Sequence, residues 1–135
     1  VAEEVDILPL VWGKAVVNSA INPICGLARV SNGELLKRKP LRELADAVCL
    51  EGQHVARAAG IRLPYKSAYE VVQRTCRQTS ANRCSMLQDM EAGRETEIEF
   101  LNGALCRIAS QHGVTVPVNW TLTQIIRWMG KRKSP

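Results

Sequence analysis

Three polar side chains recur at every fourth residue in an otherwise apolar segment near the start of the sequence. They are Lys14, Asn18 and Asn22. A helix turns once in about 3.6 residues, so this spacing places them in one narrow stripe. A buried polar group without a partner costs about 1–3 kcal/mol, so the stripe needs partners. In one interpretation these partners are polar groups of neighbouring helices, or water. In the other, the stripe lines a cleft that binds a small polar molecule.

If the stripe lines a cleft, that cleft would be wet and would present one cation, Lys14, and two amides to a bound molecule.

A carboxylate heads a second apolar row. Glu97 lies four residues before Leu101 and eight before Leu105, so a helix over this segment carries it on the face of the two leucines. Glu95 and Glu99 point elsewhere on such a helix, and we expect them in solvent. A glutamate in a first turn commonly compensates the helix dipole or completes a cap, which describes Glu95 better than Glu97. A carboxylate reaching the lysine from a second helix would also fix its position.

A further hydroxyl follows a break in the helical pattern. The segment 82–89 reads as this break followed by a short helical turn, and Ser85 lies at its start. Ser85 either caps the turn or offers a hydroxyl and an amide to an anion.

The helix that carries the polar stripe is expected from about Asp6 to Ile21. Most of its positions are apolar, which predicts burial nearly all round. Pro23 is expected to end it, so that Asn22 projects from the last turn or just beyond.

Apolar positions keep helical spacing through most of the remaining sequence. The expected elements are a helix from Leu41 to about Gly60 with Pro40 in its first turn, a helix over residues 67–80, a helix that carries Ile98, Leu101, Leu105 and Ile108 and ends at His112 and Gly113, and a short helix that carries Leu122, Ile125, Ile126 and Met129 behind a cap at Asn119 or Thr121. Residues 114–116 form the only strand-like run, which is too short for a sheet. The prediction is one all-α domain over residues 1–135.

The composition is that of a globular domain. The 135 residues are 46% hydrophobic and 23% charged, which is enough to build a core. The longest apolar runs are far shorter than the roughly 20 residues that cross a bilayer, and no leader opens the sequence, so we expect no membrane partner. The five cysteines contain no Cys-x-x-Cys pair, which argues against a disulfide framework and a zinc site and favours the cytoplasm.

The net charge of +5 includes a basic run over residues 131–133. Such a tail is commonly solvated, although it can also contact remote phosphates, and a modest positive charge suits an anionic substrate. A helical interaction or nucleic-acid-binding module is the non-enzymatic alternative. Aromatic residues make up only 4% and no recognition helix is evident, so we expect no nucleic-acid partner.

Several motifs together resemble the C-terminal helical domain of ketopantoate reductase (2-dehydropantoate 2-reductase). They follow the order of that family and cover nearly the whole chain, and the combination of the first, third and fourth is specific. The motifs are WGKAVVNSAINP (12–23), NGEL (32–35), SMLQD (85–89), GRETEIEFLNG (93–103) and the looser GVTVPVN (113–119). The resemblance implies the all-α fold of this domain, of the 6-phosphogluconate dehydrogenase C-terminal type.

The resemblance also implies an activity, the NADPH-dependent reduction of 2-dehydropantoate to pantoate in pantothenate biosynthesis. Lys14 matches the catalytic lysine that bonds the reacting carbonyl oxygen and supplies its proton. Asn18 and Asn22 match amides that hold substrate oxygens, and Ser85 matches a hydroxyl that faces the substrate carboxylate. Glu97 matches an acidic residue that binds a substrate hydroxyl and supports the lysine. The residue before this serine is often another serine in the family, and here it is a cysteine.

The dinucleotide-binding part of such a reductase is expected outside these residues. No two glycines lie closer than Gly26 and Gly33, so a G-x-G-x-x-G turn cannot form. The main NADPH site is therefore expected on an N-terminal domain that this chain lacks, and the start at Val1 suggests a domain fragment, inactive alone. A related reductase of another 2-keto acid is the alternative, and a homodimer is left open.

Overall fold

The computed structural model describes residues 8–132, apart from the side chains of residues 131 and 132. Every regular element in this range is a helix, which confirms the all-α prediction. The elements are α1 (Leu8–Ala28), α2 (Asn32–Lys37), α3 (Lys39–Ala58), α4 (Ala68–Gln78), α5 (Ser85–Ala92), the 3-10 helix η1 (Ile98–Phe100), α6 (Asn102–Gln111) and α7 (Pro117–Arg132). None of these helices combines the length and the apolar character that crossing a membrane requires.

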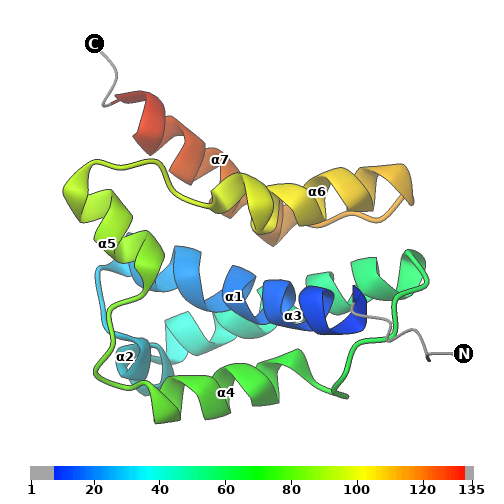
Figure 1. Ribbon diagram of the computed structural model, residues 1–135, viewed down its shortest axis with the longest axis horizontal. Coiled ribbons are helices and arrows are strands. Elements are labelled where there is room, and N and C mark those ends of the chain that lie inside the picture. The colour runs from blue at the N-terminus through cyan, green and yellow to red at the C-terminus, as the bar shows by residue number, and fades with distance from the viewer. Residues whose placement is uncertain (1–7, 133–135) are drawn as a thin grey trace, which may run out of the picture.

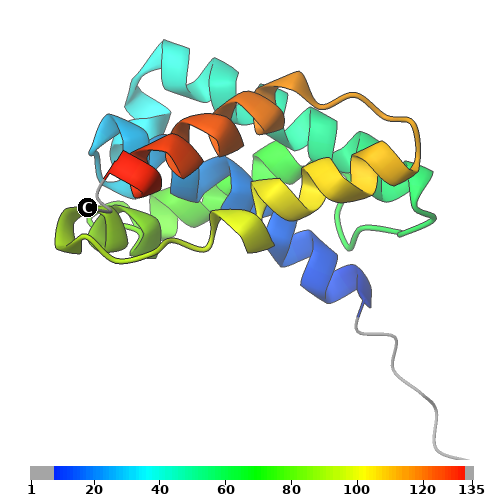
Figure 2. The same ribbon diagram turned by 90° about the horizontal axis from the view of Figure 1, so that it is seen from above.

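Helix α1 is the central element of the fold. Figure 1 shows α6 and α7 on one side of α1 and α3, with α4 on the other side and α5 at one end. Seen from above, α6 and α7 lie across the layer formed by α1 and α3 (Figure 2). Helix α1 contacts α2, α3, α4, α5 and α7, and its residues Val16, Ala20 and Ile24 are almost fully buried in the core. The polar stripe therefore belongs to the helix that the other elements surround.

Several helix boundaries follow the local signals in the sequence. Pro40 lies in the first turn of α3, and Gly60, with φ of +75°, follows its end. The Ser67 hydroxyl caps α4 by accepting a hydrogen bond from the Glu70 amide at 3.2 Å. The short helix α2 (Asn32–Lys37) was not expected, since six residues are too few to show a periodic pattern.

The prediction that Pro23 ends α1 is wrong, because the helix continues through it to Ala28. Proline has no N–H, so it leaves the carbonyl four residues earlier, that of Ser19, without its helical donor. The Asn102 side chain fills this place, with Nδ2 donating to Ser19 O at 3.0 Å. A donor from a distant part of the chain thus allows the helix to continue.

Asn102 belongs to a buried chain of amides that joins three helices to α1. Its Nδ2 also donates to Asn119 Oδ1 at 2.9 Å, and Asn119 Nδ2 donates to Glu51 Oε1 of α3 at 2.9 Å. The Glu51 carboxylate accepts from the Val118 and Asn119 amides in the first turn of α7. Helix α7 is therefore capped from α3, begins at Pro117 and has 16 residues. The predictions of a short helix and of a cap at Asn119 or Thr121 are both wrong.

Replacing Asn102 by alanine should lower the free energy of unfolding by about 1–3 kcal/mol, because two buried oxygens, Ser19 O and Asn119 Oδ1, lose their donor. Pro23→Ala returns a backbone N–H to Ser19 O, so Asn102→Ala should cost less in that background. Urea unfolding of the four combinations measures both effects. Asn82→Ala, at an exposed position, is the control. An equal cost in the two backgrounds would contradict this account of the helix.

Candidate functional site

Helix α1 presents the predicted polar stripe at its surface. Lys14 is exposed, and Asn18 and Asn22 are half-buried, while the buried positions of the same helix lie between them. The Lys14 side chain makes no hydrogen bond or ion pair with the residues that the structure describes. The Lys14 end of the stripe is therefore not occupied by polar contacts with the described residues.

The start of α1 is more open than the sequence predicts. Leu8, Leu10 and Val11 have 51, 59 and 57% of their surface exposed, so burial nearly all round is wrong for the first turn. Further along the helix the prediction holds, since Val16 and Ala20 are fully buried. Exposed apolar side chains gathered in this way are typical of an interaction surface.

The start of α5 lies against the last residue of the stripe. Cys84, not Ser85, is the N-cap of this helix, and its Sγ accepts a hydrogen bond from the Leu87 amide at 3.4 Å. The same thiol donates to Asn22 O at 3.5 Å. Burial raises the pKa of the Cys84 thiol, partly offset by the nearby amides, so it keeps the proton that it donates. The structure thus brings Asn22 and the exposed Ser85 to the same end of α1. The interpretation of Ser85 as the cap of this helix is wrong.

Glu97 does not lie on the helical row that the sequence predicts. Glu97 is exposed and directly precedes η1. The helical conformation is interrupted at Leu101, where φ and ψ are −111° and −101°. Helix α6 begins only at Asn102, so Glu97 does not share a face with Leu105. The periodic pattern in residues 97–108 spans two helices of different type.

The start of α6, five residues after Glu97, contacts α1, whereas Glu97 itself is not paired with the lysine. The bond from Asn102 to Ser19 places the start of α6 against α1, one residue beyond Asn18. Within the described residues, however, no hydrogen bond or ion pair joins Glu97 to Lys14. Helices α1 and α6 are thus in contact, but no such bond joins the Lys14 and Glu97 side chains.

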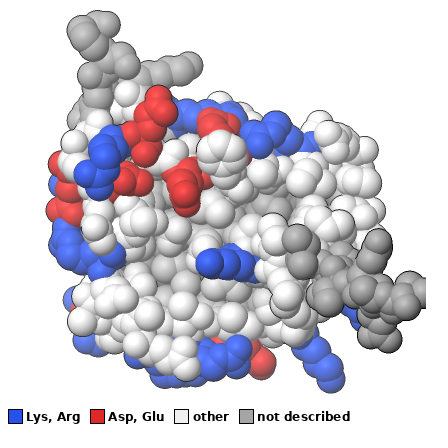
Figure 3. Space-filling model, in the orientation of Figure 1, with Lys and Arg blue, Asp and Glu red and all other residues white. Residues whose placement is uncertain are grey.

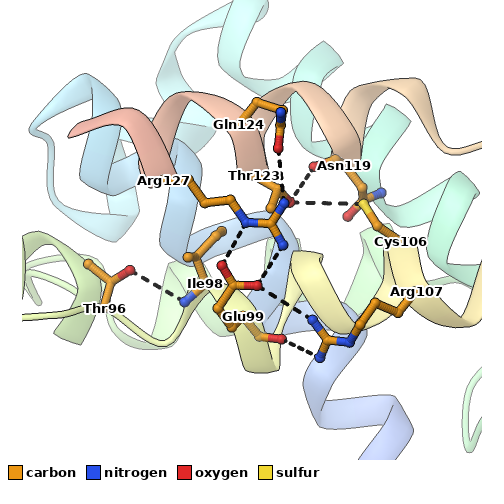
Figure 4. A network of polar contacts seen from close by, with 9 residues as sticks. All are labelled: Thr96, Ile98, Glu99, Cys106, Arg107, Asn119, Thr123, Gln124 and Arg127. Carbon is orange, nitrogen blue, oxygen red and sulfur yellow. Dashed lines mark hydrogen bonds and ion pairs between the residues drawn. The ribbon is translucent and has the colours of Figure 1, made fainter. Parts of the chain in front are cut away.

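Glu99 is the carboxylate in this segment that has partners. Its oxygens accept from Arg127 Nε and Nη2, each at 2.6 Å, and Arg107 Nη2 donates to its backbone oxygen at 2.8 Å (Figure 4). The hydrogen bond from Arg127 is the main cause that lowers the pKa of Glu99. The expectation that Glu99 is merely solvated is therefore wrong. Its partner lies 28 residues away on another helix, which no local pattern shows.

Acidic side chains gather on one face over the segment that links α5 to η1, where Glu95 and Glu97 are exposed (Figure 3). A hollow of about 630 Å³ lies between this segment and α7, with Ile98, Glu99 and Arg127 in its lining. A second hollow, of about 610 Å³, lies at the end of α3 and in the loop that follows. Neither hollow is lined by any of the five predicted site residues.

Some buried side-chain polar atoms have no hydrogen-bond partner among the described residues. Asn32 Nδ2 donates to Thr79 Oγ1 at 3.0 Å, whereas its Oδ1 has no partner among the described protein atoms. The same holds for Ser19 Oγ and Asn102 Oδ1. Such atoms are candidates for a buried water or a ligand. Asn32 was noted in the sequence only as part of a motif. No group of three or more potential metal ligands occurs in residues 8–132, side chains 131 and 132 apart.

Comparisons with known proteins agree over most of the chain. A family model described as "Ketopantoate reductase PanE/ApbA C terminal" matches residues 6–129. The 2-dehydropantoate 2-reductase of Archaeoglobus fulgidus is 43% identical over 117 residues, which are 87% of this chain and 39% of that protein. This chain thus spans about two fifths of the length of the curated relatives that it matches.

Solved structures share the fold. A PanE/ApbA family ketopantoate reductase from Ralstonia eutropha superimposes with a TM-score of 0.90 at 25% identity, over 96% of this chain and 43% of that one. A D-mandelate dehydrogenase solved with NADH and anilino(oxo)acetate gives a TM-score of 0.84 at 27% identity, over 98% of this chain and 44% of that one.

Replacing Glu99 by glutamine should remove part of the acid sensitivity of the domain. Because the folded-state pKa of Glu99 is lowered, its stabilisation is present above the unfolded-state pKa and is lost as the pH falls through the folded-state value. At neutral pH the loss should not exceed about 1 kcal/mol, since Glu99 and Arg127 keep 46 and 39% of their side-chain surface in water.

Urea unfolding between neutral pH and pH ~3 measures this effect, since an ordinary glutamate titrates near ~4.3. The difference between the Glu99→Gln variant and the unmodified chain should shrink as the pH falls. Glu95→Gln, at an exposed neighbouring carboxylate, is the control. A difference that stays constant with pH would refute the ion-pair explanation.

Proposed function

Because this chain belongs to the ketopantoate reductase family, as its C-terminal domain, we propose that it supplies the catalytic lysine and the substrate-binding residues of an NADPH-dependent 2-dehydropantoate 2-reductase. The observation that carries the proposal is the open stripe of Lys14, Asn18 and Asn22 on α1. The other half of the cleft would be the N-terminal dinucleotide-binding domain of the same protein.

Lys14 is proposed as the acid of the reaction. Its ammonium would donate a hydrogen bond to the ketone oxygen of 2-dehydropantoate and give up a proton as charge develops there. Lys14 is exposed and has no carboxylate partner among the described residues, so its ammonium is available to a substrate.

The remaining site residues are proposed to orient the substrate. Asn18 and Asn22 project from the same stripe and carry amide groups that both donate and accept, as the oxygens of a hydroxy keto acid require. Ser85, at the start of α5, lies at the Asn22 end of the stripe and would face the substrate carboxylate. The ketone oxygen would then lie towards Lys14.

Glu97 is proposed to bind the substrate hydroxyl from the segment before η1. Its exposed carboxylate has no partner among the described residues, in contrast to Glu99, whose oxygens are bound by Arg127. Once a substrate brings the two groups together, the carboxylate would also help to hold the Lys14 side chain in position.

The cofactor is proposed to bind mainly outside these residues. NADPH supplies the hydride that reduces the ketone carbon when it is bound. The sequence has no closely spaced glycines for a dinucleotide-binding turn, and residues 8–132 contain no strand that could precede one. The contribution of this chain is to bind and orient the keto acid and to hold the proton at Lys14.

A reductase of another 2-keto acid is the second candidate. The likeness to D-mandelate dehydrogenase favours it, because that protein was solved with anilino(oxo)acetate, which is also an oxo acid. A lysine and two amides would accept many such compounds. Rates with a panel of 2-keto acids that differ in branching would separate the two candidates.

Replacing Lys14 by alanine in the full-length reductase, meaning this domain joined to its dinucleotide-binding domain, should lower kcat by about 10²–10⁴ because the general acid is lost. NADPH oxidation in the presence of 2-dehydropantoate measures the rate. Lys39→Ala is the matched control, since Lys39 is exposed and forms only a surface ion pair with Glu43 at 3.8 Å. Unchanged turnover in Lys14→Ala would rule out the lysine as the acid.

The 135-residue chain alone should show no steady turnover of NADPH and 2-dehydropantoate, because the hydride donor lacks its main site. Addition of 2-dehydropantoate to the isotope-labelled chain should nevertheless shift the NMR signals of Lys14, Asn18 and Asn22. Sustained NADPH oxidation by the chain alone would contradict the two-domain proposal.

A further inference from the structure

The loop between α3 and α4 contacts α1 at one defined point. The Tyr65 hydroxyl donates a hydrogen bond to Gly13 O at 2.8 Å. Gly13 is buried, and a Cβ atom at this position would lie only 2.8 Å from Cγ and Cδ of Pro64. The close approach of the loop therefore depends on a glycine in α1.

The carbonyl that Tyr65 bonds belongs to the peptide that joins Gly13 to Lys14. A peptide unit is planar, so holding its oxygen also holds its nitrogen and the Cα atom that follows. That atom is the Cα of Lys14. Tyr65 thus acts on the backbone point from which the lysine side chain projects.

The first turn of α1 is open to solvent on its apolar side. Leu8, Leu10 and Val11, in the turn before Gly13, are more than half exposed. The next side-chain hydrogen bond to an α1 carbonyl is that of Asn102, at Ser19. A lysine side chain is flexible along its whole length, so the direction of its first bond strongly affects where the ammonium can reach.

The Tyr65 hydroxyl keeps its proton under ordinary conditions. Burial raises the pKa of Tyr65 to about 12, so the group remains a hydrogen-bond donor at neutral pH. The ring also packs against the hydrophobic core, which fixes the position of the hydroxyl.

From this geometry we propose that Tyr65 is a positioning residue, which holds the Gly13–Lys14 peptide so that Lys14 reaches the ketone oxygen of the substrate. The inference rests on the proposed function, in which Lys14 is the acid. It predicts an effect on the chemical step and not on substrate binding, since Tyr65 itself contacts only the backbone of α1 through its hydroxyl.

Tyr65→Phe in the full-length reductase removes the hydroxyl and keeps the ring. We expect kcat to fall about tenfold, because small displacements of a catalytic group are costly, and KM for 2-dehydropantoate to change less than about twofold. The thermal midpoint should fall by only a few degrees, as is usual for one hydrogen bond. Tyr69→Phe is the matched control, because no hydrogen bond of the Tyr69 hydroxyl is present in the described part of the chain. An unchanged kcat in Tyr65→Phe would overturn the inference.

A double-mutant cycle separates the inference from the proposed function. If Tyr65 acts through the lysine, Tyr65→Phe should have no further effect on kcat in the Lys14→Ala background. The same tenfold loss in both backgrounds would show that Tyr65 acts elsewhere and would overturn the inference alone. Full activity of Lys14→Ala by itself would instead contradict the proposed function, and with it the purpose assigned to Tyr65.

Discussion

The fold depends on one carbonyl oxygen that its own helix cannot satisfy. Pro23 has no N–H for Ser19 O, and a buried carbonyl without a donor is costly. Asn102 supplies the donor and is held in turn by Asn119 of α7. The carbonyl that α1 leaves without a helical donor therefore bonds to the layer formed by α6 and α7. The break in the helical hydrogen-bond pattern becomes one of the points where the two layers are joined, and the domain keeps a 21-residue helix at its centre.

The same helix carries the proposed chemistry because it is held through its carbonyl groups. Tyr65, Asn102 and Cys84, from three other segments, donate to Gly13 O, Ser19 O and Asn22 O respectively. These bonds flank the stripe of one lysine and two asparagines and leave its side chains unoccupied. A site that must meet a second domain gains from this arrangement, since its backbone is fixed while its functional groups still face outwards.

The sequence predicts those features of the fold and the site that rest on local spacing. The stripe containing Lys14 follows from helical periodicity, and so do the all-α class and the boundaries of α3 and α4. Features that rest on distant partners could not be predicted. The continuation of α1 through Pro23 depends on a side chain 83 residues from Ser19. Glu97 fits an apolar row only if the helix is continuous, and the break at Leu101 has no signal in the local pattern. Asparagine is a residue type that often caps helices, but at the start of α7 it is Glu51 of α3 that accepts the backbone hydrogen bonds.

The central claim is that the Lys14 ammonium meets the ketone oxygen of the substrate. A crystal structure of the full-length reductase with NADP⁺ and 2-dehydropantoate tests it most directly, because the oxidised cofactor cannot reduce the keto acid. The account predicts Lys14 Nζ at about 2.7–3.2 Å from the ketone oxygen, with the substrate lying along α1. A ketone oxygen bound by another group, with Lys14 directed into water, would contradict it.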